Sequence, residues 1–255
     1  MKIKDLYEYL NEKIPKTLSC EWDNDGLLCC PEPEREAKKV LICLDVTDEV
    51  VDRAIESEFD LIISHHPLIF KGLKSLAAET GPTGRVIRLI KNGISLMSFH
   101  TRFDAVDGGV NDTLADIFEL ENIEKVVCEG VAIGRVGSLK KEMSLSDFAS
   151  LVKKKLNAPT VSFAECSGKV FRVALLGGGG DDFVLDMAKS GADTYLSGTI
   201  GYHTMTEAKD MGINLVGAGH YYTEYPACAS LSRFVKDADQ SIYTEIMDSR
   251  MIFEI

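Results

Sequence analysis

The sequence contains a small set of histidines and carboxylates whose spacing suits metal chemistry. Two histidines are adjacent in the segment "SHHPLIF", and the segments "HTRFD" and "HYYTE" each place a carboxylate four residues after a histidine. Imidazole and carboxylate together bind Zn, Fe, Mn, Co or Ni without any thiolate. Enough ligands are present for two divalent ions that share a bridge, an arrangement used by many hydrolases. The expected metal ligands are His65, His66, Asp104, His220 and Glu224.

Two divalent ions carry more positive charge than the two carboxylates of this set can neutralise. We therefore expect a hydroxide, an anionic substrate or both at the site, and a phosphate-bearing small molecule suits that charge. The alternative is that these are ordinary hydrogen-bonded histidines, because His-x-x-x-Asp/Glu also occurs as a side-chain pair on a helix surface.

Each of these histidines follows an apolar run that predicts a β-strand. The runs cover residues 59–66, 94–100 and 213–220. In open α/β sheets, ligands bind outside the carboxyl ends of the strands. Adjacent side chains on a regular strand point to opposite faces, so we expect Pro67 to end the strand and let both imidazoles converge. Alternatively, the two rings serve different ions.

Strand patterns alternate with helical patterns along the chain, which predicts an α/β fold with mixed, largely parallel sheets. We place a boundary in the acidic stretch around 120–126, which gives a first lobe over 1–124 and a second over 125–255, with the chain ends packing back on the first lobe. The expected helices are 3–14, 48–55, 85–93, 108–120, 144–156, 181–191, 203–212 and 226–238, and the other strands are 38–45, 161–165, 170–176, 193–198 and 241–247.

A weak internal duplication runs through this pattern. Residues 40–64 align with residues 173–197 without gaps at a constant offset of 133 (173 − 40), and the following strands also correspond. Two similar lobes are therefore expected, each with a strand that ends in His-x-x-x-carboxylate. The identical pairs are Val40/Val173, Asp48/Asp181, Val51/Val184, Ser57/Ser190, Asp60/Asp193 and Ser64/Ser197.

Three other features have an ordinary structural interpretation. "LLGGGGDD" contains Gly177–Gly180 and is expected to form a tight turn capped by its own aspartates; a phosphate cradle is the alternative. Trp22 in "EWDNDGLL" is expected to pack beside a turn. His203 is either a pocket residue or a residue at the start of a helix.

Composition limits the class of protein. The net charge of −12 argues against a nucleic-acid partner, and a hydrophobic content of 45% with 27% charged residues is ordinary for a globular protein. The N-terminus has no signal-peptide pattern, and no apolar run is long enough to span a membrane. We therefore expect a cytoplasmic protein whose seven cysteines are mostly reduced and buried.

Four segments, "WDNDGLL", "SHHPLIF", "SFHTRFDAVDGGVND" and "GHYYTEYPA", resemble the Nif-three-like family in order and spacing, from Trp22 to about Pro226. Its members are commonly described as type 2 GTP cyclohydrolase I homologues. The resemblance implies two similar α/β lobes with a dinuclear metal site between them, often assembled as a homohexamer. It implies the same five metal ligands, with His100 beside them as a further ligand or a proton shuttle.

The sequence departs from the family pattern in two places. "HTRFD" replaces the usual "HTNLD", so we expect Arg102 to alter the rim of the site, and "SGTIGYH" replaces "TGDLKYH", with Thr199 and Gly201 in place of the Asp and Lys. The expected function is a metal-dependent hydrolase of phosphorylated or nucleotide-like small molecules. If the substrate is GTP, the attack is on C8 of guanine and formate is released. The alternative is a non-enzymatic metal-handling protein that acts through protein partners.

Overall fold

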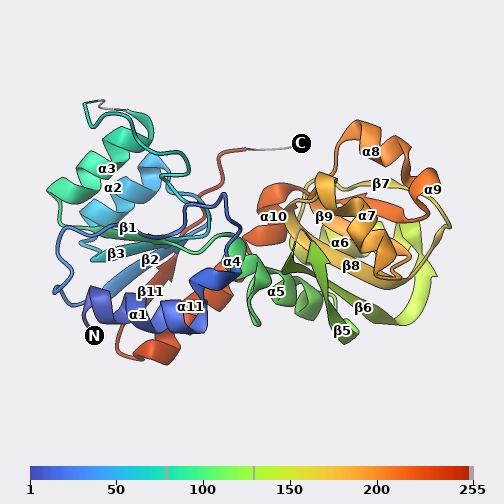
Figure 1. Cartoon of the computed structure of the whole chain (residues 1–255), viewed down its shortest axis with the longest axis horizontal. Coiled ribbons are helices and arrows are strands. Elements are labelled where there is room, and N and C mark those ends of the chain that lie inside the picture. Colours follow the sequence, from blue (N-terminus) through green and yellow to red (C-terminus); the bar gives the residue numbers. More distant parts are fainter. Residues whose placement is uncertain (78–79, 129, 253–255) are drawn as a thin grey trace. The chain divides into compact units, whose positions relative to one another are not determined.

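The structure, a computed structural model, describes residues 1–77, 80–128 and 130–252 (Figure 1). The chain forms two compact units: residues 1–106 with 228–251, and residues 107–227 with Ile252. Each unit contains one mixed β-sheet and its own helices, so the expected α/β class is confirmed. Among the described helices, none combines the length and the apolar character needed to cross a membrane.

The first unit is built on a five-stranded sheet with the order β1-β4-β3-β2-β11. Its central pairs are parallel, and only the edge strand β1 is antiparallel to its neighbour. The strands are β1 Gly26–Cys29, β2 Lys39–Cys43, β3 Leu61–Ser64, β4 Ser95–Ser98 and β11 Tyr243–Ile246. The helices are α1 Ile3–Lys13, η1 Lys16–Leu18, α2 Asp48–Glu56, α3 Gly81–Lys91, α4 Thr101–Ala105 and α11 Ala227–Ala238.

Helices cover both faces of this sheet, α2 and α3 on one face and α1 and α11 on the other (Figure 1). β2 and β3 are apolar and almost wholly buried, as expected for parallel strands covered on both faces. The side-chain oxygen of Thr47 accepts a hydrogen bond from the Val50 amide at 3.3 Å, so Thr47 is the N-cap of α2.

The second unit contains a six-stranded sheet with the order β5-β6-β8-β9-β10-β7, in which β8, β9 and β10 are parallel. The stretch around residue 124, where we placed the boundary between the lobes, lies inside β5, which forms an antiparallel hairpin with β6. The strands are β5 Glu121–Cys128, β6 Val131–Ser144, β7 Ser162–Ala164, β8 Lys169–Gly179, β9 Thr194–Thr199 and β10 Asn214–Gly217. The helices are α5 Val110–Ile117, α6 Leu145–Leu156, η2 Asp181–Phe183, α7 Val184–Lys189, α8 Tyr202–Thr206, α9 Ala208–Met211 and α10 His220–Glu224.

The strand registers repeat between the two units. Val40 pairs with Leu61 in the first unit, and Val173 pairs with Thr194 in the second, at the offset of 133 expected from the sequence. The next strand follows a second offset of 119 (214 − 95), because Leu61 pairs with Ser95 and Thr194 pairs with Asn214. The two sheets therefore share a strand–helix–strand–helix–strand core, and the expectation of two similar lobes is confirmed.

Corresponding aspartates, Asp60 and Asp193, perform the same task in both copies of this core. Asp60 Oδ2 accepts hydrogen bonds from the backbone amides of Lys38 and Lys39, both at 2.9 Å. Asp193 Oδ2 accepts them from the corresponding amides of Phe171 and Arg172, at 2.9 and 2.8 Å. Each carboxylate thus fixes the start of one strand against the start of the next.

We predict that Asp60→Ala and Asp193→Ala each lower the free energy of unfolding by about 2 kcal/mol, because two amides lose a charged acceptor. Urea unfolding followed by circular dichroism measures the change. Asp237→Ala, at an exposed position of α11, is the control and should stay within about 0.5 kcal/mol of the wild type. Losses no larger than that of the control would contradict the prediction.

Candidate metal centre

The histidines of the first unit lie where two neighbouring parallel strands end. β3 ends at Ser64 and β4 ends at Ser98. The Ser98 hydroxyl donates to the carbonyl of His65 and the Ser64 hydroxyl to the carbonyl of His66, both at 2.8 Å. The strand therefore stops before both histidines and not at Pro67, so our expectation that the proline ends it is wrong. Both histidines lie beyond the regular strand, so their side chains no longer have to point to opposite faces of the sheet.

The three imidazoles of this unit converge on one region. Ring centroids are 5.0 Å apart for His65 and His66, 5.3 Å for His65 and His100, and 5.5 Å for His66 and His100. One nitrogen from each ring lies within 4.8 Å of the nitrogens of the other two. This spacing is compatible with a shared metal ion.

Each ring is oriented through its Nδ1 atom by an oxygen acceptor. The contacts are His65 Nδ1 to the Phe99 carbonyl at 2.9 Å, His66 Nδ1 to Asp45 Oδ1 at 2.8 Å and His100 Nδ1 to Asp23 Oδ1 at 2.9 Å. These acceptors assign the proton to Nδ1 and leave the Nε2 lone pair for a ligand bond. An imidazole held in this way by a carboxylate or carbonyl is the common arrangement behind metal-ligating histidines.

A carboxylate completes the donor set of the first unit. Asp104 lies on α4, is mostly buried, and has Oδ1 3.8 Å from Nε2 of His65. Three imidazoles and one carboxylate match the ligand preferences of Zn²⁺ and of the divalent ions of Fe, Mn, Co and Ni. These histidine and acidic residues could therefore form a metal site, and their chemistry fits the group that the sequence implies.

Asp23 and Asp25 support His100 from the segment before β1. Asp23 also accepts hydrogen bonds from the amide and hydroxyl of Thr101, at 3.1 and 2.6 Å. Burial alone would raise the pKa of Asp23, but the hydrogen bonds and charge of His100, together with those from Thr101, lower it to about 2. Asp23 is thus a carboxylate at neutral pH and can hold the imidazole by a charge-assisted hydrogen bond.

Arg102 does not lie on the rim, contrary to our expectation. Its side chain is fully buried, and Nε donates to Asp25 Oδ2 at 3.0 Å. Its Nη1 donates to Asn11 Oδ1 at 2.7 Å and to the Ile14 carbonyl at 2.9 Å. Arg102 therefore links Asp25, one of the two aspartates beside His100, to Asn11 of α1.

Two exposed aromatic side chains border the histidine group. The Trp22 ring lies 6.0 Å from the rings of both Phe70 and His100, in edge-to-face geometry. Trp22 was expected to pack beside a turn, but 58% of its surface is exposed. It thus shields one side of the His100 ring.

The second unit contributes a histidine–carboxylate pair from α10. His220 Nε2 lies 3.0 Å from Glu224 Oε2, and Glu224 is buried while His220 is partly exposed. Under the offset of 119, however, His100 corresponds to Gly219 and not to His220. The two His-x-x-x-carboxylate segments are therefore displaced by one residue relative to the shared strands.

The glycine-rich segment is not the self-capped turn that we expected. Gly177–Gly179 continue β8, and Asp181 Oδ1 accepts from the Gly201 amide at 2.8 Å, while α7 has no side-chain cap. The segment instead makes room for the carboxylate. A Cβ at Gly178 would lie 2.0 Å from Glu224 Oε1, and its φ of +71° also favours glycine.

His203 is exposed on α8, where its carbonyl accepts a hydrogen bond from the Thr206 hydroxyl. This matches the interpretation of a residue near the start of a helix. Asp23, Asp45 and Gly178 were absent from our sequence-based set. For Asp23 the run "WDNDG" was the only available signal. That signal is weak, because a carboxylate beside a turn has many other uses.

Comparison with known proteins identifies the family. The model described as Duf34/NIF3 (NGG1p interacting factor 3) matches residues 1–252. The chain belongs to this family. A Clostridium perfringens protein named GTP cyclohydrolase 1 type 2 homolog is 35% identical over 242 residues, which cover 93% of this chain and 92% of that protein. A protein of the same name from Methanocaldococcus jannaschii is 33% identical over 227 residues, covering 88% and 90%.

Solved structures of the Duf34/NIF3 fold agree with the architecture. The Staphylococcus aureus hypothetical protein SA1388 matches with a TM-score of 0.92 and 30% identity, covering 100% of this chain and 99% of that chain. Reduced HcgD from Methanocaldococcus jannaschii matches with a TM-score of 0.84 and 29% identity, covering 97% and 98%.

We predict that Asp45→Asn lowers the affinity of the full chain for Zn²⁺ by roughly 10–100-fold, because the amide no longer holds the His66 ring by a charged hydrogen bond. Competition with a chromogenic chelator measures the affinity. Asp237→Asn is the matched control and should bind as the wild type does. Equal affinities for the two variants would contradict a role for Asp45 in positioning His66.

Gly178→Ala should displace the Glu224 carboxylate and weaken Zn²⁺ binding to the full chain, since the new methyl group would overlap Oε1. The neighbouring Gly179→Ala is the control, because a Cβ there meets no heavy atom of the described residues within 4 Å. The same chelator competition, with an unfolding curve for each variant, separates loss of the ligand from loss of the fold. Equal Zn²⁺ affinity for the two alanine variants would show that Glu224 does not need this space.

Proposed function

We propose that this protein is a hydrolase of nucleotide-like small molecules that depends on two divalent metal ions per chain. The first unit supplies His65, His66 and Asp104 as ligands, and the second supplies His220 and Glu224. The observation that carries the proposal is the imidazole group of the first unit, in which an oxygen acceptor holds every Nδ1 and one nitrogen of each ring lies within 4.8 Å of those of the other two.

Family membership supports the choice of substrate class. Relatives such as the Clostridium perfringens protein are named for GTP cyclohydrolase, which acts on a nucleotide. The acidic chain, with a net charge of −12, needs a local positive charge to attract a phosphorylated substrate. Bound divalent ions supply that charge. The protein is proposed to act in the cytoplasm, and the family resemblance favours a homohexamer.

The chain's own residues have separate tasks in this proposal. Divalent ions, when bound, act as Lewis acids toward water and substrate. His100 accepts and returns a proton at Nε2, while Asp23 fixes the ring through Nδ1 at 2.9 Å. Trp22 and Phe70 restrict the access of water to the same ring.

We predict that the full chain, purified without chelator, contains more than one divalent ion per chain and hydrolyses GTP or another phosphorylated small molecule. Elemental analysis measures the metal, and release of formate or phosphate measures turnover. His65→Ala and Glu224→Ala should lower turnover by more than the roughly 10–100-fold loss typical of residues that only orient a ligand. His203→Ala is the matched control and should keep both metal and turnover.

Two results would contradict the hydrolase. Less than one ion per chain would remove its cofactor. Tight metal binding without turnover on a broad panel of phosphorylated molecules, together with rapid transfer of the metal to apo-acceptor proteins, would instead indicate the metal-handling function.

A further inference from the structure

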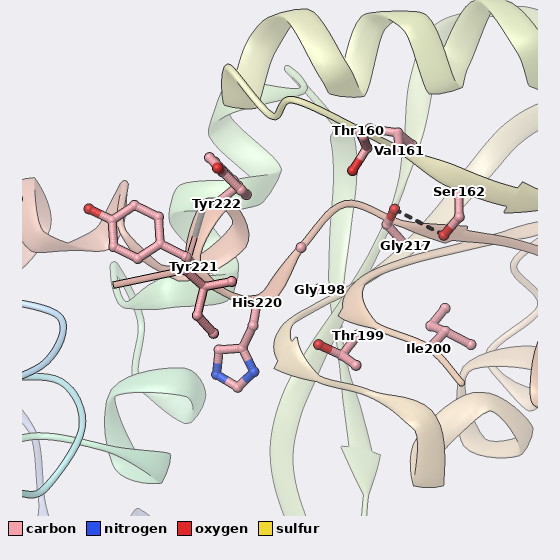
Figure 2. A pocket seen from close by; sticks show the side chains of 12 residues that line it. Thr160, Val161, Ser162, Gly198, Thr199, Ile200, Gly217, His220, Tyr221 and Tyr222 are labelled. Carbon is pink, nitrogen blue, oxygen red and sulfur yellow. Dashed lines mark hydrogen bonds between the residues drawn. The ribbon is translucent and has the colours of Figure 1, made fainter. Parts of the chain in front are cut away.

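The second unit contains a cavity at the carboxyl ends of β9 and β10, and His220 is the one proposed metal ligand in the lining that the structure describes. Its volume is about 400 Å³, within the range of roughly 300–1,000 Å³ of small-molecule sites. Figure 2 shows Thr160 and Ser162 along one side, Thr199 along the other, and the backbone of Gly198 between them. The imidazole of His220 lies at one end of this cavity.

The cavity occupies the place that the histidine group occupies in the first unit. Under the two offsets of the duplication, the three histidines correspond to residues with little or no side chain, and all three of these line the cavity. The corresponding pairs are His65 and Gly198, His66 and Thr199, and His100 and Gly219. The second copy therefore presents open space where the first presents three rings.

The carboxylates behind the histidines are also replaced. β1 pairs with β4 in the first unit as β7 pairs with β10 in the second, with Gly26 opposite Ser98 and Ser162 opposite Gly217. The residues before Gly26 include Asp23 and Asp25, whereas the cavity wall before Ser162 is formed by threonine and valine. The second unit thus has uncharged residues at the place where the first unit has two carboxylates.

The chemistry of the lining selects an uncharged ligand. Of the described residues that line the cavity, none is Lys, Arg, Asp or Glu, and the groups present are hydroxyls, glycine backbone, tyrosines and aliphatic side chains. The described part of the wall has no lysine or arginine side chain that could form an ion pair with a phosphate. Hydroxyl and peptide groups beside apolar surface suit a flat heterocycle with polar edges.

Two of the lining glycines cannot be replaced without a change in the backbone or in the packing around them. A Cβ at Gly198 would lie 2.5 Å from the Gly178 carbonyl and 2.6 Å from the Thr223 hydroxyl. At the other strand end, Gly219 has a φ of +87° that favours glycine. Both positions therefore favour glycine, and neither can carry a side chain that corresponds to the imidazoles of the first unit.

We propose that this cavity binds the nucleoside part of the substrate, an uncharged heterocycle with its sugar. The inference rests on the proposed function for the identity of the substrate, and it assigns the neutral part of that molecule to the second unit. His220, one of the two metal ligands proposed on α10, also lines this cavity, so the proposed metal site and the nucleoside site are adjacent at this residue.

Titration calorimetry of the metal-loaded full chain tests the proposal with adenosine, guanosine, cytidine and uridine as neutral probes and sodium tripolyphosphate as the anionic probe. Thr199→Trp and Thr160→Trp fill the cavity from opposite sides at exposed positions. Thr206→Trp, at an exposed position of α8 outside the lining, is the matched control. Metal content and turnover are measured on each protein.

At least one nucleoside should bind the wild type, and both filling variants should weaken it by about tenfold or more, with the control and the metal content unchanged. Absence of binding by all four nucleosides, or equal binding by the filling variants and the wild type, would overturn the proposal. So would loss of tripolyphosphate binding in the filling variants in place of nucleoside binding. Nucleoside binding without turnover would contradict the hydrolase and leave the cavity assignment intact.

Discussion

The candidate site depends on a constraint of sheet geometry, that neighbouring parallel strands which start in register also end at the same edge. β3 and β4 are paired from Leu61 and Ser95 to Ser64 and Ser98, and adjacent strands lie about 4.8 Å apart. The residues that follow the two strands must therefore be neighbours, whatever their type. In the first unit this places the imidazoles together, and in the second it places the cavity-lining residues together.

The two corresponding aspartates show how the constraint is maintained. Asp60 and Asp193 fix the opposite ends of the same strands, where each accepts two backbone amides. Because register is set at the amino ends, the carboxyl ends can carry residues chosen for chemistry. Ser64 and Ser98 complete the arrangement by holding the carbonyls of the two adjacent histidines.

Much of this fold could be predicted from the sequence because its signals are local. The apolar runs of β2, β3 and β4 were predicted from the sequence alone. The duplication was also visible, since 133 residues separate matching positions in two strands and the helix between them. The histidines were found because their types are rare and each follows an apolar run.

The remaining features depend on contacts between distant segments. Nothing near Asp23 indicates that its partner is His100, 77 residues away. Arg102 was expected at the rim because it replaces an amide of the family pattern, but in the interior it donates hydrogen bonds to Asp25 and Asn11. The hairpin of β5 and β6 was missed because its exposed, charged first strand lacks the apolar run of a buried one.

The one-residue displacement between His100 and His220 has a consequence for how such proteins diverge. His100 precedes α4 as its N-cap, whereas His220 is the first residue of α10. An N-cap residue has non-helical backbone angles, so its side chain points in a different direction from that of the first helical residue. Exchanging histidine and glycine at adjacent positions thus redirects a ligand without moving a strand. The scaffold separates the residues that maintain folding from those that select chemistry, so relatives can acquire new reactivity through substitutions at the strand ends alone.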